Sequence, residues 1–198
     1  MKVGVLALQG DVREHVSALI ACGVTPISVR RSVELDQIDA LVLPGGESTT
    51  IAQLSEVFGI YDQIKDRIVQ GMPVYGSCAG MILLANEIFD AKVGQKSFGG
   101  LDITVRRNAF GRQVDSFESD IAFDDGSADL IRAVFIRAPW VERVGDGVQV
   151  LAAVDKHPVA VRSQRLFATS FHPELTGDHR IHRYFIEEVA RPALEKVK

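Results

Sequence analysis

The sequence predicts an α/β fold with a doubly wound, mostly parallel sheet and an antiparallel excursion. Three observations support this fold class. Short apolar runs alternate with helical patterns through the first half of the chain, and glycine-containing turns follow those runs. From about Leu101 to Val161, short strand-like runs follow one another without convincing helices between them. Strands that alternate with helices imply a parallel sheet covered on both faces.

The first unit begins with the apolar run Lys2 to Leu8, which predicts a strand. Asp11 and Glu14 then have the spacing of a capping box, and apolar residues recur at helical spacing until Cys22-Gly23, where glycine is the expected stop signal. Further strands are predicted at Pro26 to Val29, Asp39 to Leu43 and Pro73 to Tyr75. Helices are predicted from Ser48 or Thr49 to about Phe58, and from Met81 to Phe89.

The antiparallel region is predicted from five short apolar runs: Leu101 to Val105, Phe117 to Phe123, Ala133 to Ile136, Val148 to Val154 and Val159 to Val161. A strand at Leu166 to Phe171 follows, then a turn at His172 to Gly177, and a last helix from about Asp178 to Ala190 that ends near Pro192. Since no repeat or linker interrupts the chain, residues 1–198 are expected to form one domain.

Composition excludes several classes of protein. With 198 residues and 46% hydrophobic residues, the chain can bury a core, so disorder is excluded as its main state. A formal net charge of -4 without a basic block argues against nucleic acid as a ligand. The apolar run near the start is too short for a signal peptide or a membrane span, so we expect a cytoplasmic protein that does not bind membranes. Two cysteines cannot by themselves form a structural zinc site.

The sharpest local signal is Gly76-Ser77-Cys78-Ala79-Gly80, between a predicted strand and a predicted helix. It has the arrangement G-x-nucleophile-x-G, with cysteine as the nucleophile. A nucleophile on so tight a turn needs small neighbours, and the start of the following helix favours a thiolate. The N–H of Ala79 is placed to stabilise an oxyanion. The alternative is a structural cysteine in a tight turn, which is our interpretation of Cys22.

A cysteine nucleophile needs a base, and the base needs a group that orients it. His172-Pro173-Glu174 supplies both after a predicted strand. Loops at the carboxyl ends of parallel strands gather round one crevice, so His172 can meet Cys78. An isolated H-P-E would more simply be a surface turn, and its occurrence with the cysteine turn favours catalysis instead.

The segment Pro44 to Thr50 (PGGESTT) has glycines before a predicted helix, but it lacks the spacing and the lysine of a phosphate loop. Its N–H groups are better suited to a carboxylate or an oxyanion, unless the segment is an ordinary connection. The remaining histidines, His15, His157, His179 and His182, are interpreted as surface or partly packed groups, and no metal site is expected.

Three separated segments, PGGEST, GSCAG and SFHPEL, together resemble class I glutamine amidotransferases, which use a Cys-His-Glu triad. The segments VLALQGDVREH, RRNAFGRQVDSFE, VFIRAP and FHPELTGDHRIH narrow the resemblance to the glutaminase subunits of pyridoxal 5'-phosphate synthases. The resemblance runs from about Val3 to Phe185 and is weakest between Asp90 and Gly100.

This resemblance implies specific site residues. Cys78 would be the nucleophile, His172 the general base and acid, and Glu174 the group that orients His172. The glutamine site would be lined by Gly46, Glu47, Ser48, Arg107, Ile136 and Arg137. Gly45 and Gly46 would complete an oxyanion site with Ala79. An arginine suits the α-carboxylate of a free amino acid, but the sequence does not decide which arginine binds it.

The resemblance also implies the reaction and the partners. L-Glutamine would be hydrolysed to glutamate and ammonia through a γ-glutamyl thioester, without a cofactor. The ammonia would pass to a synthase barrel subunit in a hetero-oligomeric complex that makes pyridoxal 5'-phosphate (vitamin B6). Two alternatives stay open: a cysteine hydrolase acting on another γ-glutamyl compound, and a regulatory subunit whose cysteine is a redox sensor or a relic.

Overall fold

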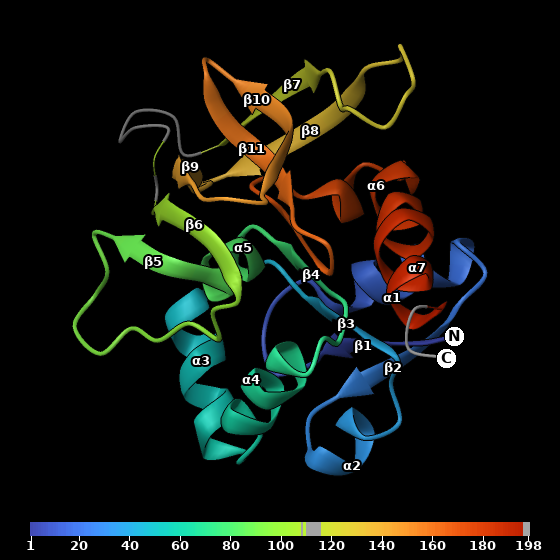
Figure 1. Cartoon of the computed structure of the whole chain (residues 1–198), viewed down its shortest axis with the longest axis vertical. Coiled ribbons are helices and arrows are strands. Elements are labelled where there is room, and N and C mark those ends of the chain that lie inside the picture. Colours follow the sequence, from blue (N-terminus) through green and yellow to red (C-terminus); the bar gives the residue numbers. More distant parts are fainter. Residues whose placement is uncertain (108, 110–115, 196–198) are drawn as a thin grey trace.

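A seven-stranded mixed sheet forms the centre of the computed structural model, which describes residues 1–107, 109 and 116–195 (Figure 1). Its strands, in spatial order, are β10 (Gln149–Val154), β11 (His157–Arg162), β12 (Leu166–Thr169), β4 (Val74–Ser77), β3 (Ala40–Leu43), β1 (Lys2–Leu6) and β2 (Thr25–Val29). The five strands from β12 to β2 are parallel, whereas β10 and β11 extend the sheet in antiparallel fashion. The predicted fold class is confirmed.

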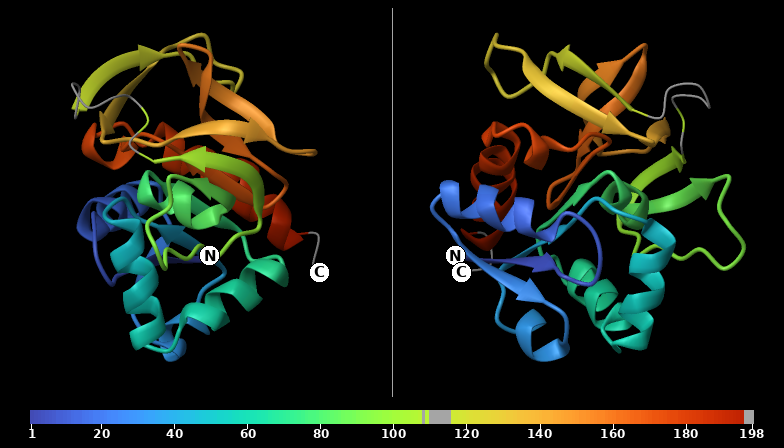
Figure 2. Two further views of the ribbon diagram at one scale, coloured as in Figure 1. Left: turned by 90° about the vertical axis from the view of Figure 1, so that its left-hand side faces the viewer. Right: turned by 180° about the vertical axis from the view of Figure 1, so that it is seen from behind.

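Helices cover both faces of the sheet, as the two further views in Figure 2 show. One face carries α3 (Ser48–Val57), α4 (Tyr61–Val69) and α5 (Ala79–Leu84). The other carries α1 (Val12–Ala21), α6 (Arg180–Tyr184), a π-helical segment (Phe185–Ala190) and α7 (Arg191–Glu195). None of the helices in the described part of the chain is long and apolar enough to cross a membrane.

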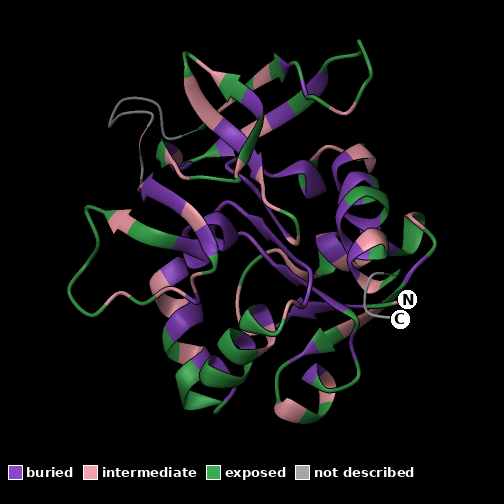
Figure 3. Cartoon of the chain, viewed as in Figure 1, coloured by how far each residue is buried: buried purple, intermediate pink, exposed green. Residues whose placement is uncertain are grey.

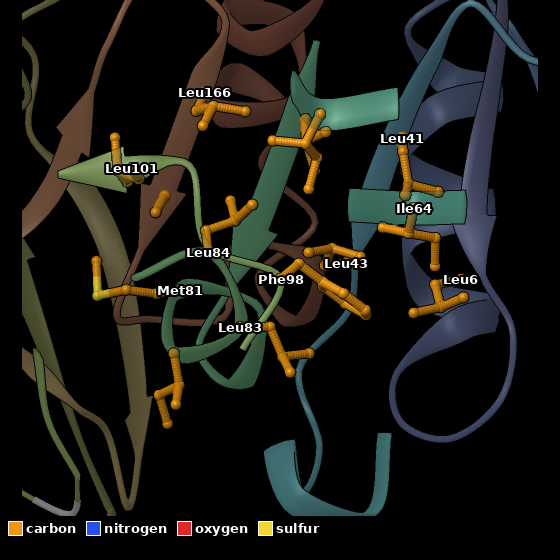
Figure 4. Close-up of a cluster of buried hydrophobic side chains, with 14 of the residues drawn as sticks. Leu6, Leu41, Leu43, Ile64, Met81, Leu83, Leu84, Phe98, Leu101 and Leu166 are labelled. Atoms are coloured by element: carbon orange, nitrogen blue, oxygen red, sulfur yellow. The ribbon is translucent and has the colours of Figure 1, made fainter. Parts of the chain in front are cut away.

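The strands β12, β4, β3 and β1 of the parallel sheet are buried on both faces, whereas the edge strand β2 is largely exposed or half-buried, and Figure 3 shows the central strands as the most enclosed part of the chain. Successive residues of a strand point to opposite faces, so one strand supplies two cores. In β3, Leu41 and Leu43 join the cluster shown in Figure 4, while Ala40 and Val42 join the cluster on the opposite face. The unbroken apolar run Ala40–Leu43 is therefore explained by helices on both sides.

Two smaller sheets make up most of the predicted antiparallel excursion. One has the order β5 (Ala85–Phe89), β6 (Leu101–Arg106), β9 (Trp140–Val144), and the other pairs β7 (Ser116–Ile121) with β8 (Ile131–Ile136). The pairs β6–β9 and β7–β8 are antiparallel, but β5 and β6 are parallel. Asn108 and residues 110–115 of the RRNAFGRQVDSFE segment lie outside the described residues.

The structure corrects several predicted elements. The helix expected over Met81–Phe89 ends at Leu84, and Ala85–Phe89 forms β5 because it finds a partner strand in β6. The last helix does not end near Pro192. It begins at Arg180 and runs on to Glu195, and Pro192 comes shortly after the π-helical segment Phe185–Ala190 within this run. Three elements were not predicted: α2 (Ser32–Leu35), α4 and β9.

Candidate active site

Cys78 lies on a sharp turn between β4 and α5, as the sequence predicts. Its φ and ψ angles are 49° and -98°, a backbone conformation that residues other than glycine rarely adopt. A Cβ atom on Gly76 would lie 2.4 Å from the backbone carbonyl of Gly80, and one on Gly80 would lie 2.3 Å from the carbonyl oxygen of Leu43. The two glycines are therefore required by close backbone approach. Cys78 is buried, and the close packing around these two glycines keeps it in its strained conformation.

His172 and Glu174 follow β12, which is the parallel neighbour of β4 in the sheet. The two strands end side by side, so the loops that follow them meet at one edge. Pro173–Leu175 forms a 3₁₀ turn that brings Glu174 back under the imidazole. The Nδ1 atom of His172 lies 2.8 Å from Oε1 of Glu174 and 3.3 Å from Oδ2 of Asp11. Two carboxylates thus face one ring nitrogen.

The charges at this site reinforce one another. Burial lowers the pKa of His172, but Asp11, Cys78 and Glu174 outweigh it and raise that pKa to about 12. Burial raises the pKa of Glu174, and the interactions with His15 and His172 more than offset it, so the pKa ends below its ordinary value. Near neutral pH, the pair is therefore an imidazolium and a carboxylate.

The other ring nitrogen of His172 is still unpaired. Its Nε2 atom is buried and has no hydrogen-bond partner among the described residues. The Sγ atom of Cys78 instead lies 3.9 Å from the carbonyl oxygen of Ile136. The His172–Glu174 half of a triad is thus assembled, while a Cys78–His172 hydrogen bond is not formed in this conformation.

A pocket of about 340 Å³ opens between these groups. It is lined by Gln9, Asp11, Gly46, Glu47, Ser48, Cys78, Ala79, Ile82, Lys92, Arg107, Ile136, Arg137 and His172. A volume of this size suits a small molecule such as an amino acid. Arg137, like Cys78, has a positive φ, of 44°. Two strained residues therefore line one pocket, as is common at functional sites.

A polar network closes one side of the pocket. Nη2 of Arg107 lies 3.0 Å from Oε1 of Glu47, and Nζ of Lys92 lies 3.6 Å from the same oxygen. Gln95 accepts a hydrogen bond from Arg107 through Oε1, and its Nε2 donates to Oγ of Ser48 at 3.1 Å. Glu47, not the expected Ser48 or Thr49, caps α3 and accepts a bond from the Thr50 N–H at 2.7 Å.

The structure brings the residues implied by the resemblance to one place. Gly46, Glu47, Ser48, Cys78, Ala79, Arg107, Ile136, Arg137 and His172 all line the pocket. Glu174 lies behind His172, and Gly45 lies against the imidazole, where an added Cβ would be 2.3 Å from Cε1. Ala79 is the first residue of α5, a position whose N–H has no partner within the helix.

Some residues of the site were not foreseen. Asp11 was predicted to cap α1 with its side chain, but it makes no such bond and instead contacts His172. Its position directly after β1 is the signal that could have placed it, because that strand end borders the same crevice. Lys92 and Gln95 belong to the segment between β5 and β6, where no local pattern indicates a site.

Two further expectations can be compared with the structure. His15 and His182 are fully buried, so their interpretation as surface or partly packed groups was wrong. Cys22 is partly buried, with Sγ 3.8 Å from the carbonyl oxygen of His179. Among the described residues, Asp11, His172 and Glu174 bring three ligand-type atoms within 4.8 Å of one another, but His172 and Glu174 already satisfy each other there.

The chain is similar to known proteins along most of its length. The model of the SNO glutamine amidotransferase family matches residues 5–191. "Pyridoxal 5'-phosphate synthase subunit PdxT" of Nocardia farcinica is 60% identical over 195 residues, which cover 94% of this chain and 85% of that protein.

Two solved structures are also similar to this chain along most of its length. A crystal structure described as a glutamine amidotransferase is 49% identical, covers 93% of this chain and 97% of its own, and has a TM-score of 0.87. The structure of PurLQS from Thermotoga maritima is 18% identical, and the match covers 100% of this chain and 98% of that chain with a TM-score of 0.66. At this identity, the similarity supports the fold alone. The resemblance drawn from the sequence motifs is confirmed, and the chain belongs to the SNO glutamine amidotransferase family.

Proposed function

We propose that this chain is a glutaminase that supplies ammonia to a pyridoxal 5'-phosphate synthase. The observation that carries the proposal is the pocket in which Cys78 lies on a strained turn beside a His172–Glu174 ion pair. Similarity over 94% of the chain to a synthase subunit supports the same activity. Residues 1–198 would act as one glutaminase domain, since both the parallel sheet and the inserted strands contribute to the pocket.

The reaction begins at the side-chain amide of L-glutamine. The Cys78 sulfur, as thiolate, attacks the amide carbon and forms a C–S bond, and the negative charge moves to the amide oxygen. The N–H of Ala79, at the start of α5, and those of Gly45 and Gly46 would stabilise this oxyanion. His172 gives a proton to the departing nitrogen, the C–N bond breaks, and ammonia leaves a γ-glutamyl thioester.

Water completes the cycle. The now neutral His172 accepts a proton from a water molecule, whose oxygen attacks the thioester carbon. The C–S bond breaks and the thiolate and imidazolium are restored, while the γ-carboxyl group of the product releases the second water proton to solvent and glutamate leaves. Glu174 keeps its proton-free form throughout and holds Nδ1–H of His172, which leaves Nε2 as the nitrogen that exchanges protons.

The polar network of the pocket suits the α-amino and α-carboxylate groups of free glutamine. Burial raises the pKa of Glu47, but hydrogen bonds from Thr50 and the charge of Lys92 lower it below its ordinary value, so this residue is an anion. An anionic side chain attracts the α-ammonium group. Among the described residues, Arg107 and Arg137 are the arginines of the lining, and the guanidinium group of either can bind a carboxylate in bidentate fashion.

We infer that the synthase subunit stimulates the reaction. Gln9 Oε1 accepts a hydrogen bond from the Glu47 N–H at 2.8 Å, and the Asp11 N–H donates to the Gly45 carbonyl at 3.2 Å. Two hydrogen bonds thus connect the loop after β1 to the segment that contains Gly45 and Gly46. A partner that binds the loop after β1 would therefore also move the Gly45–Gly46 segment.

The test is ammonia release from L-glutamine by the purified chain, with and without the synthase barrel subunit, and with Cys78→Ala as control. Release that requires Cys78 and rises with the synthase supports the proposal. A complex that is assembled but releases no ammonia would contradict it. Preference for another γ-glutamyl compound would favour the hydrolase alternative.

A further inference from the structure

Two histidines that the proposed mechanism does not use lie beside Glu174. His15, on α1, has its Nε2 atom 3.5 Å from Oε1 of Glu174, the same oxygen that binds His172. The Nδ1 atom of His15 lies 2.9 Å from Nε2 of His182, on α6. Both imidazoles have no exposed surface. A continuous row of polar groups therefore runs from His172 through Glu174 and His15 to His182.

The surroundings of this pair are apolar and aromatic. The ring of Tyr75 lies edge-on to both imidazoles, with centroid distances of 6.1 Å to His15 and 5.8 Å to His182. Tyr75 itself is fully buried, with its hydroxyl 2.9 Å from Oγ1 of Thr169. Burying two imidazoles costs free energy unless their nitrogens find partners. The pair reaches the Glu174 carboxylate through Nε2 of His15, which lies 3.5 Å from Oε1. This is an electrostatic contact, since Nε2 makes no hydrogen bond to any of the described residues.

One arrangement of protons fits the contacts better than any other. Burial lowers the pKa of both histidines, so each carries one ring proton near pH 7. If His15 holds its proton on Nε2, the N–H dipole points toward Glu174, and Nδ1 accepts a hydrogen bond from Nε2–H of His182. The Nδ1 atom of His182 then carries no proton, in agreement with its having no partner among the described residues.

The opposite arrangement is unfavourable at both ends. A proton on Nδ1 of His15 would leave the Nε2 lone pair facing the Glu174 carboxylate. It would also require His182 to carry its proton on Nδ1, a buried donor with no acceptor in the described part of the chain. The hydrogen bond from His182 therefore fixes the tautomer of His15.

We propose that His15 is a positioning residue for the glutaminase site, and that His182 fixes the tautomer in which His15 does so. This inference rests on the proposed function. In the described part of the chain, the side-chain hydrogen bonds to the Glu174 carboxylate other than that of His172 come from the hydroxyl of Ser77, at 3.2 and 3.4 Å. His15 adds an N–H dipole on Oε1, which keeps the carboxylate ionised and aligned with Nδ1 of His172.

The activity test compares two substitutions of similar size. In His15→Gln the amide nitrogen reaches the position of Nε2, whereas in His15→Asn it reaches only that of Nδ1. With the synthase present, we expect His15→Asn to lower kcat about 10- to 100-fold, with KM for glutamine changed less than about twofold, the scale expected of a misplaced catalytic group. We expect His15→Gln to keep kcat within about threefold of wild type, and His157→Asn, on β11 outside the pocket, to serve as control.

Equal kcat values for the Asn and Gln variants, or a loss confined to KM, would overturn the positioning role. A wild-type complex that releases no ammonia would overturn the proposed function instead, so the two failures are distinguishable. Circular dichroism and binding to the synthase establish that each variant is folded.

A second measurement needs neither glutamine nor a variant that folds. Imidazole ¹⁵N NMR of the wild-type chain reports the tautomer of each histidine, and the titratable neighbours that act on the pair are Glu14, Asp11, His172, Glu174 and His179. We expect both His15 and His182 as neutral Nε2–H tautomers near pH 7. An Nδ1–H tautomer or a doubly protonated ring at His15 would overturn the inference even if the variants proved too unstable to assay.

Discussion

Gly45 touches the imidazole of His172 through bare backbone: a Cβ atom added to Gly45 would lie 2.3 Å from Cε1 and 2.7 Å from Nδ1. The same Cβ would lie 2.8 Å from Oδ2 of Asp11. The loop after β3 therefore packs against the base and one of its carboxylates without a side chain between them.

We expect Gly45→Ala to lower kcat by about 100-fold or more, because an added methyl group must push the imidazole out of line and a displacement of about 1 Å can cost that much. Ammonia release in the presence of the synthase measures the effect. Gly126→Ala is the control: an added Cβ would meet nothing within 4 Å, so this substitution strains the backbone at a φ of 85° without displacing a side chain and should leave kcat unchanged. Unchanged kcat in Gly45→Ala would show that His172 can move without loss of function.

The sequence predicts the elements of this site better than the contacts between them. The turn at Cys78 and the turn at Pro173 carry local signals, namely the paired glycines and the proline, and the βα rhythm places both at one edge of the sheet. The structure brings these two turns together in the expected way.

Asp11 illustrates what local sequence reasoning cannot reach. Its spacing to Glu14 suggests a cap for α1, but in the folded chain a distant histidine competes for the same carboxylate. His15 and His182 lie on helices whose local patterns give no reason to bury an imidazole, and their burial depends on how α1 and α6 pack around Tyr75. The strand β5 likewise exists because β6 is beside it, a pairing that helical spacing in Met81–Phe89 conceals.

The Gln95 side chain should set the affinity for glutamine. It holds both Arg107 and Ser48 in place at the pocket. We expect Gln95→Ala to raise KM about 3- to 10-fold with little change in kcat, because a free arginine must lose on the order of 1 kcal/mol of rotamer entropy on binding substrate. Lys96→Ala, next in the chain and paired with Glu56 outside the pocket, should leave KM unchanged. A fall in kcat at constant KM would argue against this role.

Arg180 should stabilise the attachment of the β7–β8 hairpin to α6. Its Nε and Nη2 atoms lie 2.6 and 2.7 Å from the two oxygens of Asp125, and its Nη1 donates to the Asp129 carbonyl at 2.8 Å. We expect Arg180→Ala to lower the free energy of unfolding by about 1–3 kcal/mol, because this pair is charge-assisted, bidentate and partly buried. Urea denaturation measures the change, and Asp125→Asn completes a double-mutant cycle.

Arg132 provides the matched comparison. It also meets two carboxylates, Glu118 and Asp120, but the side chains of all three residues are at least half exposed. Exposed ion pairs contribute little, so Arg132→Ala should change the free energy of unfolding much less than Arg180→Ala does. Equal effects of the two substitutions would mean that burial does not decide the strength of these pairs.

The three buried histidines should give stability a maximum near neutral pH. Burial lowers the folded-state pKa of His15 and His182, so below about pH 6.5 the unfolded chain binds protons that the folded chain does not. Stability therefore falls as the pH drops, by up to about 1.4 kcal/mol per pH unit for each histidine. His172 acts in the opposite direction. Burial alone would lower its pKa, but Asp11, Cys78 and Glu174 raise it to about 12, so its contribution is complete below about pH 6.5 and is lost as the pH rises.

Chemical denaturation between about pH 5 and pH 8.5 measures the free energy of unfolding on the acid side and on the alkaline side of this maximum. The carboxylates with lowered pKa titrate below this range. His182→Gln removes one group with a lowered pKa. It should reduce the loss of stability on the acid side of the maximum and leave the loss on the alkaline side in place. His172→Gln should do the reverse, because the imidazolium that is stabilised in the folded chain is gone. A wild-type profile of the free energy of unfolding against pH that has no maximum would show that His15 and His182 are not both neutral beside a charged His172. The same would follow if both variants changed the same side of the profile.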